Sequence, residues 1–529
     1  MDVSEIDSEI ESDVAGATEV SRGRIVVNAV SNYVNLGFSL VLMLFLQAFL
    51  VRQLGRNQYA LWPLAETCVG FLALIPLGVG SGAGRFLAFA LADRKFEEVE
   101  QITSSLFFAM CAAAVLYAAG GTVLSLYFES VFDIPEGAAG IGPWVMFFMG
   151  LAGAVAMPFG VFEGGLVATQ RYVALNVIRV TVIALRVAMV VVIFLVGYRS
   201  LVWLAVVNFV LAICGGVAAW LYARRHVPWQ RVRVRGFNWT VLRKVTNYSG
   251  LTLLIAVAGL MYWKTDNIVI NKLLDPSLLT AYAVVASFVL GIYQLVSRGT
   301  GVLMPAVTVL FARKDTDRIA RLIYRANRIL VPATVPVFLF LVAFGGEMLT
   351  LYIGPQYARY AVLFPILAAS GIMSCTQTSS GSVPQGMGRL GVITAASMTW
   401  AVLNVILSIV FVTVFNLELV GVALGTALVT IFAKGGWQPA YIAHLLHRGW
   451  FDVFYNLILM PLGHCVPAGL IIVGLRATGW GHGWIGLGLV FTCLALFQAV
   501  YMVLVVIDAN DRALVFRVLK GIFKPGTEG

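Results

Sequence analysis

Long runs of apolar residues, separated by short polar segments, recur along the whole chain. A helix needs about 20 apolar residues to cross a hydrocarbon core about 30 Å thick, and by this measure the chain has 14 spanning helices. The pattern predicts an all-α, polytopic membrane protein with short loops. We expect the spans at residues 25–50, 59–83, 101–126, 141–167, 172–196, 201–223, 246–271, 278–310, 323–353, 361–383, 392–415, 419–444, 457–475 and 484–507.

The charged residues are few and unevenly placed. Only 12% of the 529 residues are charged, about half the share of a soluble protein. The net charge of +10 would suit a nucleic-acid partner, but its distribution indicates membrane topology instead. If both termini are cytoplasmic, 26 of the 36 lysines and arginines fall on the cytoplasmic side, 6 outside and 4 within spans. Because cytoplasmic loops are enriched in Lys and Arg, this orientation is predicted, and no nucleic-acid partner is expected.

Short motifs recur in the two halves of the chain at offsets of 223, 219 and 218 residues. The pairs are Tyr59-Ala-Leu-Trp with Tyr282-Ala-Val-Val, Arg94-Lys95 with Arg313-Lys314, and Thr169-Gln-Arg171 with Gly386-Met-Gly-Arg389. Repeats of this kind are typical of transporters, whose binding site lies between the repeats. We therefore predict two six-helix lobes in parallel repeat, plus two C-terminal helices, with a cavity between the lobes.

The predicted domain boundaries follow from these spans. They are an acidic cytoplasmic tail (1–24), an N-terminal lobe (25–223), a basic cytoplasmic linker (224–245), a C-terminal lobe (246–446), two further helices (447–507) and a cytoplasmic tail (508–529). Two interpretations of the linker stay open: its arginines either orient the helices in the membrane or bind anionic lipid headgroups.

Six of the charged residues inside the predicted spans are candidates for a functional role. A charge at the bilayer centre costs about 3 kcal/mol on insertion scales and normally faces a cavity or a partner. The candidate cavity cations are Arg186, Lys264, Arg298 and Lys434, and the candidate coupling acids are Glu66 and Asp266. Lys264 and Asp266 lie about 200° apart around a helix, so one would face the cavity while the other pairs with a neighbouring helix. A purely structural ion pair is the alternative.

Several motifs resemble the polysaccharide-export flippases of the multidrug/oligosaccharidyl-lipid/polysaccharide superfamily. Leu77-Gly-Val-Gly-Ser-Gly-Ala-Gly-Arg85 ends the second span, and Lys264-Thr-Asp-Asn-Ile-Val-Ile270 is followed by Tyr282. Gly386-Met-Gly-Arg-Leu390 leads to Asn404 and then to Gly421-Val-Ala-Leu-Gly425. The resemblance covers nearly the whole chain, and it implies a two-lobe transporter that works by alternating access.

The resemblance also implies the substrate, a polyprenyl-diphosphate-linked oligosaccharide flipped from the cytoplasmic to the outer leaflet for polysaccharide or lipopolysaccharide synthesis. It implies a bacterial inner-membrane protein, monomeric, with membrane lipids and possible polymerase and glycosyltransferase partners. The sequence contains no nucleotide-binding loop, zinc motif or nucleophile elbow, so we expect no enzyme, cofactor or metal site. Coupling to H⁺ or Na⁺ stays open.

Three alternatives are weighed against this interpretation. A cation-coupled multidrug exporter shares the architecture, but its cationic substrates favour acids rather than arginines in the spans. A lipid II flippase is expected to carry arginines in its first helix, and residues 25–50 contain none. A membrane glycosyltransferase or polymerase needs a sizeable outer loop, and the outer loops here have about a dozen residues or fewer.

Overall fold

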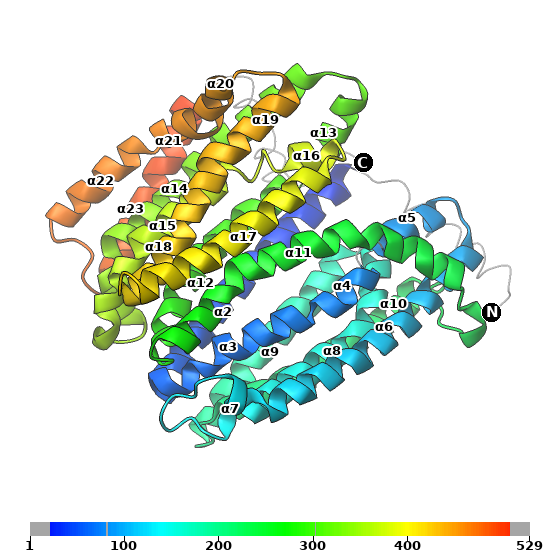
Figure 1. Cartoon of the computed structure of the whole chain (residues 1–529). Helices are drawn as coiled ribbons and strands as arrows, with labels where there is room; N and C mark the ends of the chain where they lie inside the picture. Colours follow the sequence, from blue (N-terminus) through cyan, green and yellow to red (C-terminus); the bar gives the residue numbers. More distant parts are fainter. Residues whose placement is uncertain (1–21, 81–82, 302, 508–529) are drawn as a thin grey trace, which may run out of the picture. The chain divides into compact units, whose positions relative to one another are not determined.

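The computed structural model describes residues 22–80, 83–301 and 303–507, and the regular secondary structure of these residues is helical throughout (Figure 1). Thirteen of its helices are long and apolar enough to cross a membrane, and a shorter apolar helix covers Leu61–Leu77. Together these fourteen segments confirm the predicted spans. The predicted tails, residues 1–24 and 508–529, lie outside the described residues except for 22–24, which begin the first helix.

Several spans consist of more than one helix, because glycine, proline or a polar turn interrupts them. In the N-terminal half the helices are α2 (Arg22–Tyr59), α3 (Leu61–Leu72), α4 (Leu74–Gly80), α5 (Ala83–Ala92), α6 (Phe96–Leu126), α7 (Phe128–Val131), α8 (Ile141–Ala168), α9 (Tyr172–Leu195), α10 (Leu201–His226) and α11 (Trp239–Leu273). The second predicted span, for example, is divided between α3 and α4.

The remaining helices continue the same pattern. They are α12 (Leu278–Thr300), α13 (Leu303–Ala312), α14 (Thr316–Tyr352), η2 (Pro355–Val362), α15 (Leu363–Thr376), α16 (Ser382–Gly386), α17 (Leu390–Thr413), α18 (Glu418–Thr430), η3 (Ile431–Trp437), α19 (Gln438–Leu446), α20 (Trp450–Phe454), η4 (Tyr455–Leu459), α21 (Met460–Gly463), α22 (Val466–Ala477), α23 (Gly483–Tyr501) and η5 (Met502–Val506). Here η2 is a 3₁₀ helix, whereas η3, η4 and η5 are π-helical turns within longer helices.

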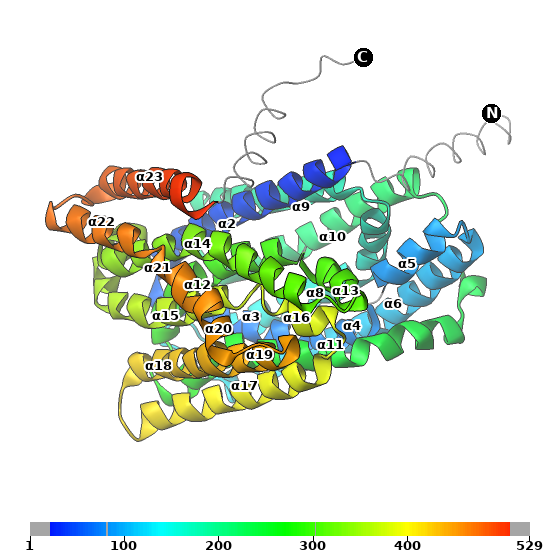
Figure 2. The ribbon, with the colours of Figure 1, turned by 90° about the horizontal axis from the view of Figure 1, so that it is seen from above.

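The helices pack into two compact units. The first contains the chain up to Thr280 together with Thr394–Val405 of α17, and the second contains the rest. In the first unit α8 packs against α6 and α10, and α2 lies along α9 (Figure 2). In the second unit α14 contacts α15, α22 and α23. The predicted lobe boundaries, which place the division in the linker at residues 224–245, stay a prediction.

The internal repeat is visible in the helix boundaries. Helix α5 of the first unit ends at Ala92, and α13 of the second unit ends at Ala312. After three intervening residues in each case, α6 begins at Phe96 and α14 begins at Thr316. Both boundaries are displaced by 220 residues, from 92 to 312 and from 96 to 316. The two halves therefore correspond here at an offset of 220, one residue more than the Arg-Lys motif predicts.

The turns that follow α5 and α13 also share their backbone geometry. Arg94 and Lys314 have positive φ angles of 55° and 56°, a conformation that closes helices at the C′ position. In the first turn Arg94 N donates to Leu91 O at 3.1 Å, and Lys95 N donates to Ala90 O at 2.9 Å. The equivalent bonds around Lys314 measure 2.9 and 3.1 Å. The two Schellman turns therefore place Arg94 and Lys314 at equivalent positions, so Lys95 corresponds to Asp315.

The basic linker is folded rather than extended. Its turn after α10 is tied to α8, because Gln230 Nε2 donates to Val161 O at 2.7 Å. Ser104 and Ser105 of α6 accept hydrogen bonds from the backbone nitrogens of Arg233 and Asn238 at 3.0 and 2.9 Å. The Asn238 side chain in turn caps α11 by accepting from Thr240 N at 3.0 Å. Because of this cap, α11 begins at Trp239, seven residues before the predicted span.

Close helix contacts in the second unit depend on glycine. Gly421 and Gly425 lie one turn apart on α18 and face α17. A Cβ atom on Gly425 would lie 2.8 Å from the backbone nitrogen of Ser408, and one on Gly421 would lie 3.1 Å from the carbonyl carbon of Phe411. Small residues with this spacing let helix backbones approach closely in membranes. The glycines at 421 and 425 are thus explained by packing.

We predict that Gly425→Ala lowers the thermal stability of the detergent-purified protein, because the added methyl group overpacks the α17–α18 contact at a cost of about 1–3 kcal/mol. The matched control is Gly474→Ala on α22, where an added Cβ would meet nothing within 4 Å. Scanning fluorimetry measures both. An equal melting temperature for the two variants would contradict the packing argument.

Candidate functional site

The first unit contains an ion pair between two of the predicted residues. Lys264 Nζ of α11 lies 3.4 Å from Glu66 Oε2 of α3. The other carboxylate oxygen, Glu66 Oε1, accepts a hydrogen bond from Trp62 Nε1 at 2.9 Å. The Lys264 side chain is 26% exposed and the Glu66 side chain is 38% exposed. Their own unit therefore encloses them only partly. The structure therefore places the Lys264 side chain against an acid of a neighbouring helix.

Arg186 of α9 completes what we call the Glu66 cluster, formed by Glu66, Lys264 and Arg186. The carboxylate of Glu66 lies within electrostatic reach of the Arg186 guanidinium. Arg186 contacts Met43 Sδ at 3.9 Å, and its Nε is buried without a hydrogen-bond partner among the described residues. Lys264 thus contacts the carboxylate directly, whereas Arg186 interacts with it through its charge.

Asp266 points to a different neighbour from Lys264. Its side chain is 4% exposed, and its Oδ1 accepts a long hydrogen bond of 3.5 Å from Asn404 Nδ2 of α17. The next residue, Asn267, donates to Thr67 Oγ1 at 2.9 Å. These two bonds fix one face of α11 while Lys264 occupies another, as the angular separation of about 200° requires.

Lys434 lies in the second unit, within the π-helical turn η3 (Ile431–Trp437). Such turns interrupt α-helices most often at functional sites. Lys434 Nζ donates to Gln438 Oε1 at 2.9 Å, and no acid pairs with it among the described residues of its unit. Gly435 and Gly436 follow it, and an added Cβ would find open space at Gly436 and only an ordinary contact with Met373 at Gly435.

A polar network that the sequence reasoning missed extends from Lys434 into the second unit. Gln438 Nε2 donates to Ser380 Oγ at 2.9 Å, and Ser380 Oγ donates to Gln377 Oε1 at 2.7 Å. Asn327 of α14 bonds Ser379 and donates to Leu457 O at 2.9 Å. These side chains are all nearly inaccessible. Gln377 Nε2 is buried without a partner in the described chain, which is uncommon in a native structure.

The signal for this network was present in the sequence. Residues 376–381 read Thr-Gln-Thr-Ser-Ser-Gly inside the predicted span 361–383. The structure breaks the helix there, between α15 and α16, because the serine and threonine hydroxyls bond nearby backbone oxygens. A six-residue polar run within an apolar span predicts such a break, and its hydroxyls need internal partners.

Arg298 is placed apart from these groups. It lies near the end of α12 with an exposed side chain. It makes no hydrogen bond or ion pair with the described residues of its own unit. The structure thus brings together Glu66, Lys264 and Arg186, connects Lys434 to a separate network, and leaves Arg298 and Asp266 outside both. Whether each cation contacts substrate stays a prediction.

Comparisons with known proteins point in one direction. A family model described as polysaccharide biosynthesis protein matches residues 49–362. EpsK of Bacillus subtilis (strain 168), an uncharacterised membrane protein, is 20% identical over 514 residues, which cover 94% of this chain and 99% of EpsK. The probable low-salt glycan biosynthesis flippase Agl15 of Haloferax volcanii is 24% identical over 236 residues, 44% of this chain and 47% of Agl15.

Solved structures share the fold. A multidrug resistance MATE family transporter of the MOP superfamily, in an inward-facing conformation, aligns with a TM-score of 0.61 at 14% identity over 77% of this chain and 95% of that chain. The lipid II flippase MurJ, in an inward closed conformation, aligns with a TM-score of 0.61 at 13% identity over 94% of this chain and 100% of that chain. At these identities the likeness concerns architecture alone.

We predict a measurable coupling between Lys264 and Glu66. Lys264→Met leaves the carboxylate without its cation, whereas Glu66→Gln/Lys264→Met removes both charges, so a double-mutant cycle should give about 1 kcal/mol or more. The control is the ion pair between Lys272 of α11 and Asp133, whose side chains are 41% and 57% exposed and whose charged atoms lie 3.3 Å apart. Because this pair is more exposed, it should couple by less than about 0.5 kcal/mol. Thermal unfolding in detergent measures both cycles, and equal couplings would argue against an enclosed pair at Glu66.

Proposed function

Because the chain belongs to the polysaccharide biosynthesis protein family, we propose that it is a flippase of the MOP superfamily for a polyprenyl-diphosphate-linked oligosaccharide. The substrate moves from the cytoplasmic to the outer leaflet by alternating access, for cell-surface polysaccharide synthesis. Agl15 carries the name of a glycan biosynthesis flippase, which supports the substrate class. The fold shared with MATE and MurJ transporters supports a transporter architecture.

The Glu66 cluster is the observation in the structure that carries this proposal. A diphosphate and a sugar chain cannot cross hydrocarbon unaided, because the transfer of charge and unsatisfied hydroxyls out of water is costly. Arg186 and Lys264 outnumber the acid between them, so the cluster retains a positive charge for an anionic group. Arginine in addition forms bidentate hydrogen bonds with phosphate oxygens. Arg186 Nε has no hydrogen-bond partner among the described residues, so no bond to a neighbouring residue would have to break for it to donate to phosphate.

A cation-coupled multidrug exporter is the second candidate, and the MATE likeness is the observation that favours it. Its cationic substrates would require a surplus of acids. The predicted spans contain more lysines and arginines than acids instead, and Lys434 has no acidic partner among the described residues of the second unit. The charge distribution therefore favours an anionic substrate. The fold likeness to MurJ favours the lipid II flippase alternative in the same way, whereas residues 25–50 lack the arginines expected of it.

Coupling and cellular context belong to the proposal as well. We infer that Glu66 or Asp266 exchanges H⁺ or Na⁺ during the cycle, because each is an acid within a predicted span and each is held by a neighbouring helix. The charge bias of the loops supports cytoplasmic termini. We further propose that the protein lies in a bacterial inner membrane as a monomer. Polysaccharide polymerases and glycosyltransferases would be its protein partners.

Reconstituted flipping tests the function. In proteoliposomes that contain a lipid-linked oligosaccharide, the wild type should expose the sugar to an external lectin, and Arg186→Ala should slow this exposure about tenfold or more, because phosphate loses a charge-assisted donor. Arg179→Ala is the matched control. Arg179 lies on the same helix and is already paired with Glu163 at 2.6 Å, so flipping should change little.

A cellular experiment separates the two candidate functions. In cells without the gene, lipid-linked oligosaccharides should accumulate on the cytoplasmic leaflet while dye efflux stays unchanged. Normal delivery to the outer leaflet together with lost efflux would replace the flippase assignment with the multidrug exporter. Equal slowing by Arg186→Ala and Arg179→Ala would leave the Glu66 cluster without a specific role.

A further inference from the structure

A cavity of about 760 Å³ lies in the first unit, between the basic linker and the helices α6, α8 and α10. Each of the three helices contributes aromatic side chains to its lining, which are Phe107, Phe159, Phe162 and Trp220. Its lining also includes arginines from the end of α10 and from the linker, namely Arg224, Arg231 and Arg233. A cavity of this size suits a small-molecule or headgroup ligand. We call it the linker cavity.

The walls of the linker cavity are fixed by packing and by a buried hydrogen bond. Gln230 is buried and donates to Val161 O of α8 at 2.7 Å, which holds the linker turn against that helix. A Cβ atom on Gly165 would collide with the Gln230 side chain, and one on Gly216 would collide with the ring of Phe159. The glycines at 165 and 216 are therefore needed for this arrangement.

Two of the three arginines carry charge that no acid of the described chain neutralises. Arg233 pairs with Glu100 at 3.4 Å. Arg231 Nε donates to a backbone carbonyl of its own turn at 3.0 Å, and the Arg224 guanidinium lies 5.7 Å from the ring centre of Trp220. A guanidinium that stacks on a ring keeps its in-plane N–H groups for other acceptors. The linker cavity therefore has two positive charges in excess and free donors for an anion.

The linker beyond the cavity exposes apolar and aromatic side chains. Val234 is 79% exposed and Trp239 is 67% exposed, and Phe237 between them is also exposed. Exposed aromatic residues beside arginines are typical of the boundary between membrane and water. The linker thus has the composition of a segment that contacts lipid headgroups, and the predicted topology assigns it to the cytoplasmic leaflet.

The internal repeat identifies residues of the second unit that correspond to the cavity lining. At the offset of 220 that relates α6 to α14, Phe107 corresponds to Asn327. The turns after α8 and α16 correspond at an offset of 218, because Gln170 and Gly388 have positive φ angles of 59° and 68°. In both turns the next backbone nitrogen donates to the carbonyl group five residues earlier at 2.8 Å.

The second unit fills the corresponding positions with polar side chains instead of leaving a cavity. At the offset of 218, Phe162 corresponds to Ser380. Asn327 and Ser380 are both fully buried and belong to the hydrogen-bonded network described above. The same scaffold therefore exists with a closed polar network at these positions. Neither the helix packing nor the turns require an open aromatic cavity in the first unit.

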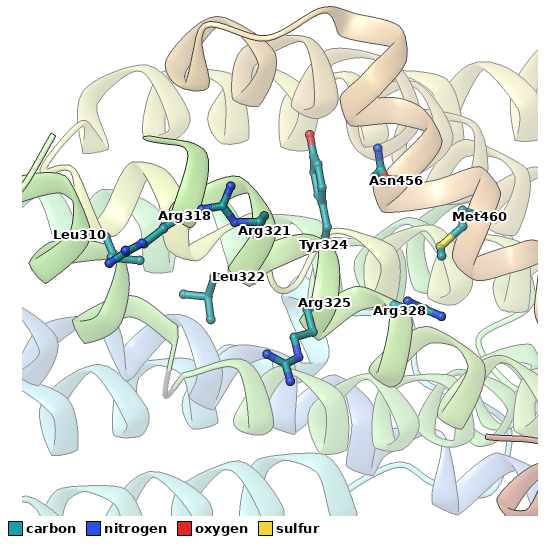
Figure 3. A pocket seen from close by; sticks show the side chains of 9 residues that line it. All are labelled: Leu310, Arg318, Arg321, Leu322, Tyr324, Arg325, Arg328, Asn456 and Met460. Carbon is teal, nitrogen blue, oxygen red and sulfur yellow. The ribbon is translucent and has the colours of Figure 1, made fainter. Parts of the chain in front are cut away.

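A second basic cavity, of about 600 Å³, lies beside α14 in the second unit and differs from the linker cavity (Figure 3). Figure 3 shows the four arginines of α14 pointing in different directions around it. Arg318 pairs with Asp315 at 3.1 Å, and Arg325 and Arg328 are engaged with other groups of the chain. This second cavity therefore offers no comparable surplus of positive charge.

We propose that the linker cavity binds an anionic phospholipid from the membrane leaflet beside it. The phosphate contacts Arg224 and Arg231, and the start of an acyl chain lies along the aromatic side chains. Basic pockets between membrane helices on the cytoplasmic side are typical binding sites for anionic headgroups. This inference goes beyond the proposed function, because it concerns a lipid that is bound and not transported, and it does not depend on the substrate.

Native mass spectrometry of the purified full-length protein in neutral detergent tests the proposal, with phosphatidylglycerol and zwitterionic phosphatidylcholine as probes. The wild type should prefer phosphatidylglycerol, because the excess positive charge disfavours a choline headgroup. Arg224→Gln/Arg231→Gln should weaken phosphatidylglycerol binding about tenfold or more, because the phosphate loses two charge-assisted donors. Both side chains are exposed, so the variant should fold. Equal binding of the two lipids to the wild type would overturn the proposal.

The matched control is Arg225→Gln/Arg235→Gln. It removes the same charge from exposed positions in the same segment that do not line the cavity, so it should bind phosphatidylglycerol like the wild type. Equal loss in this control and in the cavity variant would reduce the effect to the net charge of the linker and would refute the site.

A variant that fills the cavity tests the apolar part without changing any charge. Val217→Trp adds a large side chain to the lining from α10 and should also abolish phosphatidylglycerol binding. Phosphatidylglycerol should raise the melting temperature of the wild type and of the control but not of the two cavity variants, because a ligand that binds only the folded state stabilises it. Retained binding in Val217→Trp would assign the lipid to the linker surface and overturn the cavity.

Competition experiments separate the phospholipid from other phosphates. An excess of glycerol 3-phosphate should not displace phosphatidylglycerol, because it lacks the acyl chains that contact the aromatic side chains. Displacement would reassign the linker cavity to a soluble phosphate. Tighter binding of farnesyl diphosphate than of phosphatidylglycerol would likewise overturn the proposal, in favour of a prenyl carrier lipid.

Discussion

The constraint on which the structure depends is the lack of hydrogen-bonding solvent in hydrocarbon. Every backbone group within a span needs an internal partner, so the spans are helical, and every charge within a span needs a compensating group or a cavity. Interruptions are tolerated only where side chains replace the missing bonds. The break between α15 and α16 satisfies this condition, since the hydroxyls of residues 376–382 bond nearby carbonyl groups. Polar residues in the spans therefore occur where a hydrogen bond or charge needs a partner, or where the protein needs them for function.

Apolar periodicity predicted the spans because the cost of an exposed backbone leaves no alternative to a helix. The repeat was predictable for a related reason: the turns after α5 and α13 need a residue with positive φ and the same two backbone bonds, so similar residues recur there. Boundaries were less predictable. The early start of α11 depends on Asn238, which caps the helix and also bonds Ser105 of α6, and such a tertiary contact leaves no mark on local hydropathy.

The sequence predicted which charged residues belong to the candidate site, but it did not predict which residues of other helices they contact. Composition alone identified Lys264 and Asp266 as residues on different faces of a helix. It did not identify Glu66 and Asn404 as their partners, because those residues lie about 200 and 138 positions away and meet α11 only through helix packing. The network around Gln377 escaped notice for another reason. Neutral hydroxyls and amides attract less attention than charges, although in a dry interior an unpaired amide is also costly.

The repeat offers a way to separate structural residues from functional ones without an alignment. Positions at which both halves share a residue class, such as Val99 and Ile319, are explained by the scaffold. At Glu98 and Arg318, or Ser105 and Arg325, the halves differ although the scaffold is the same. The scaffold therefore does not dictate the residue there, and a difference between the halves at such a position needs another explanation than helix formation or the turn before it.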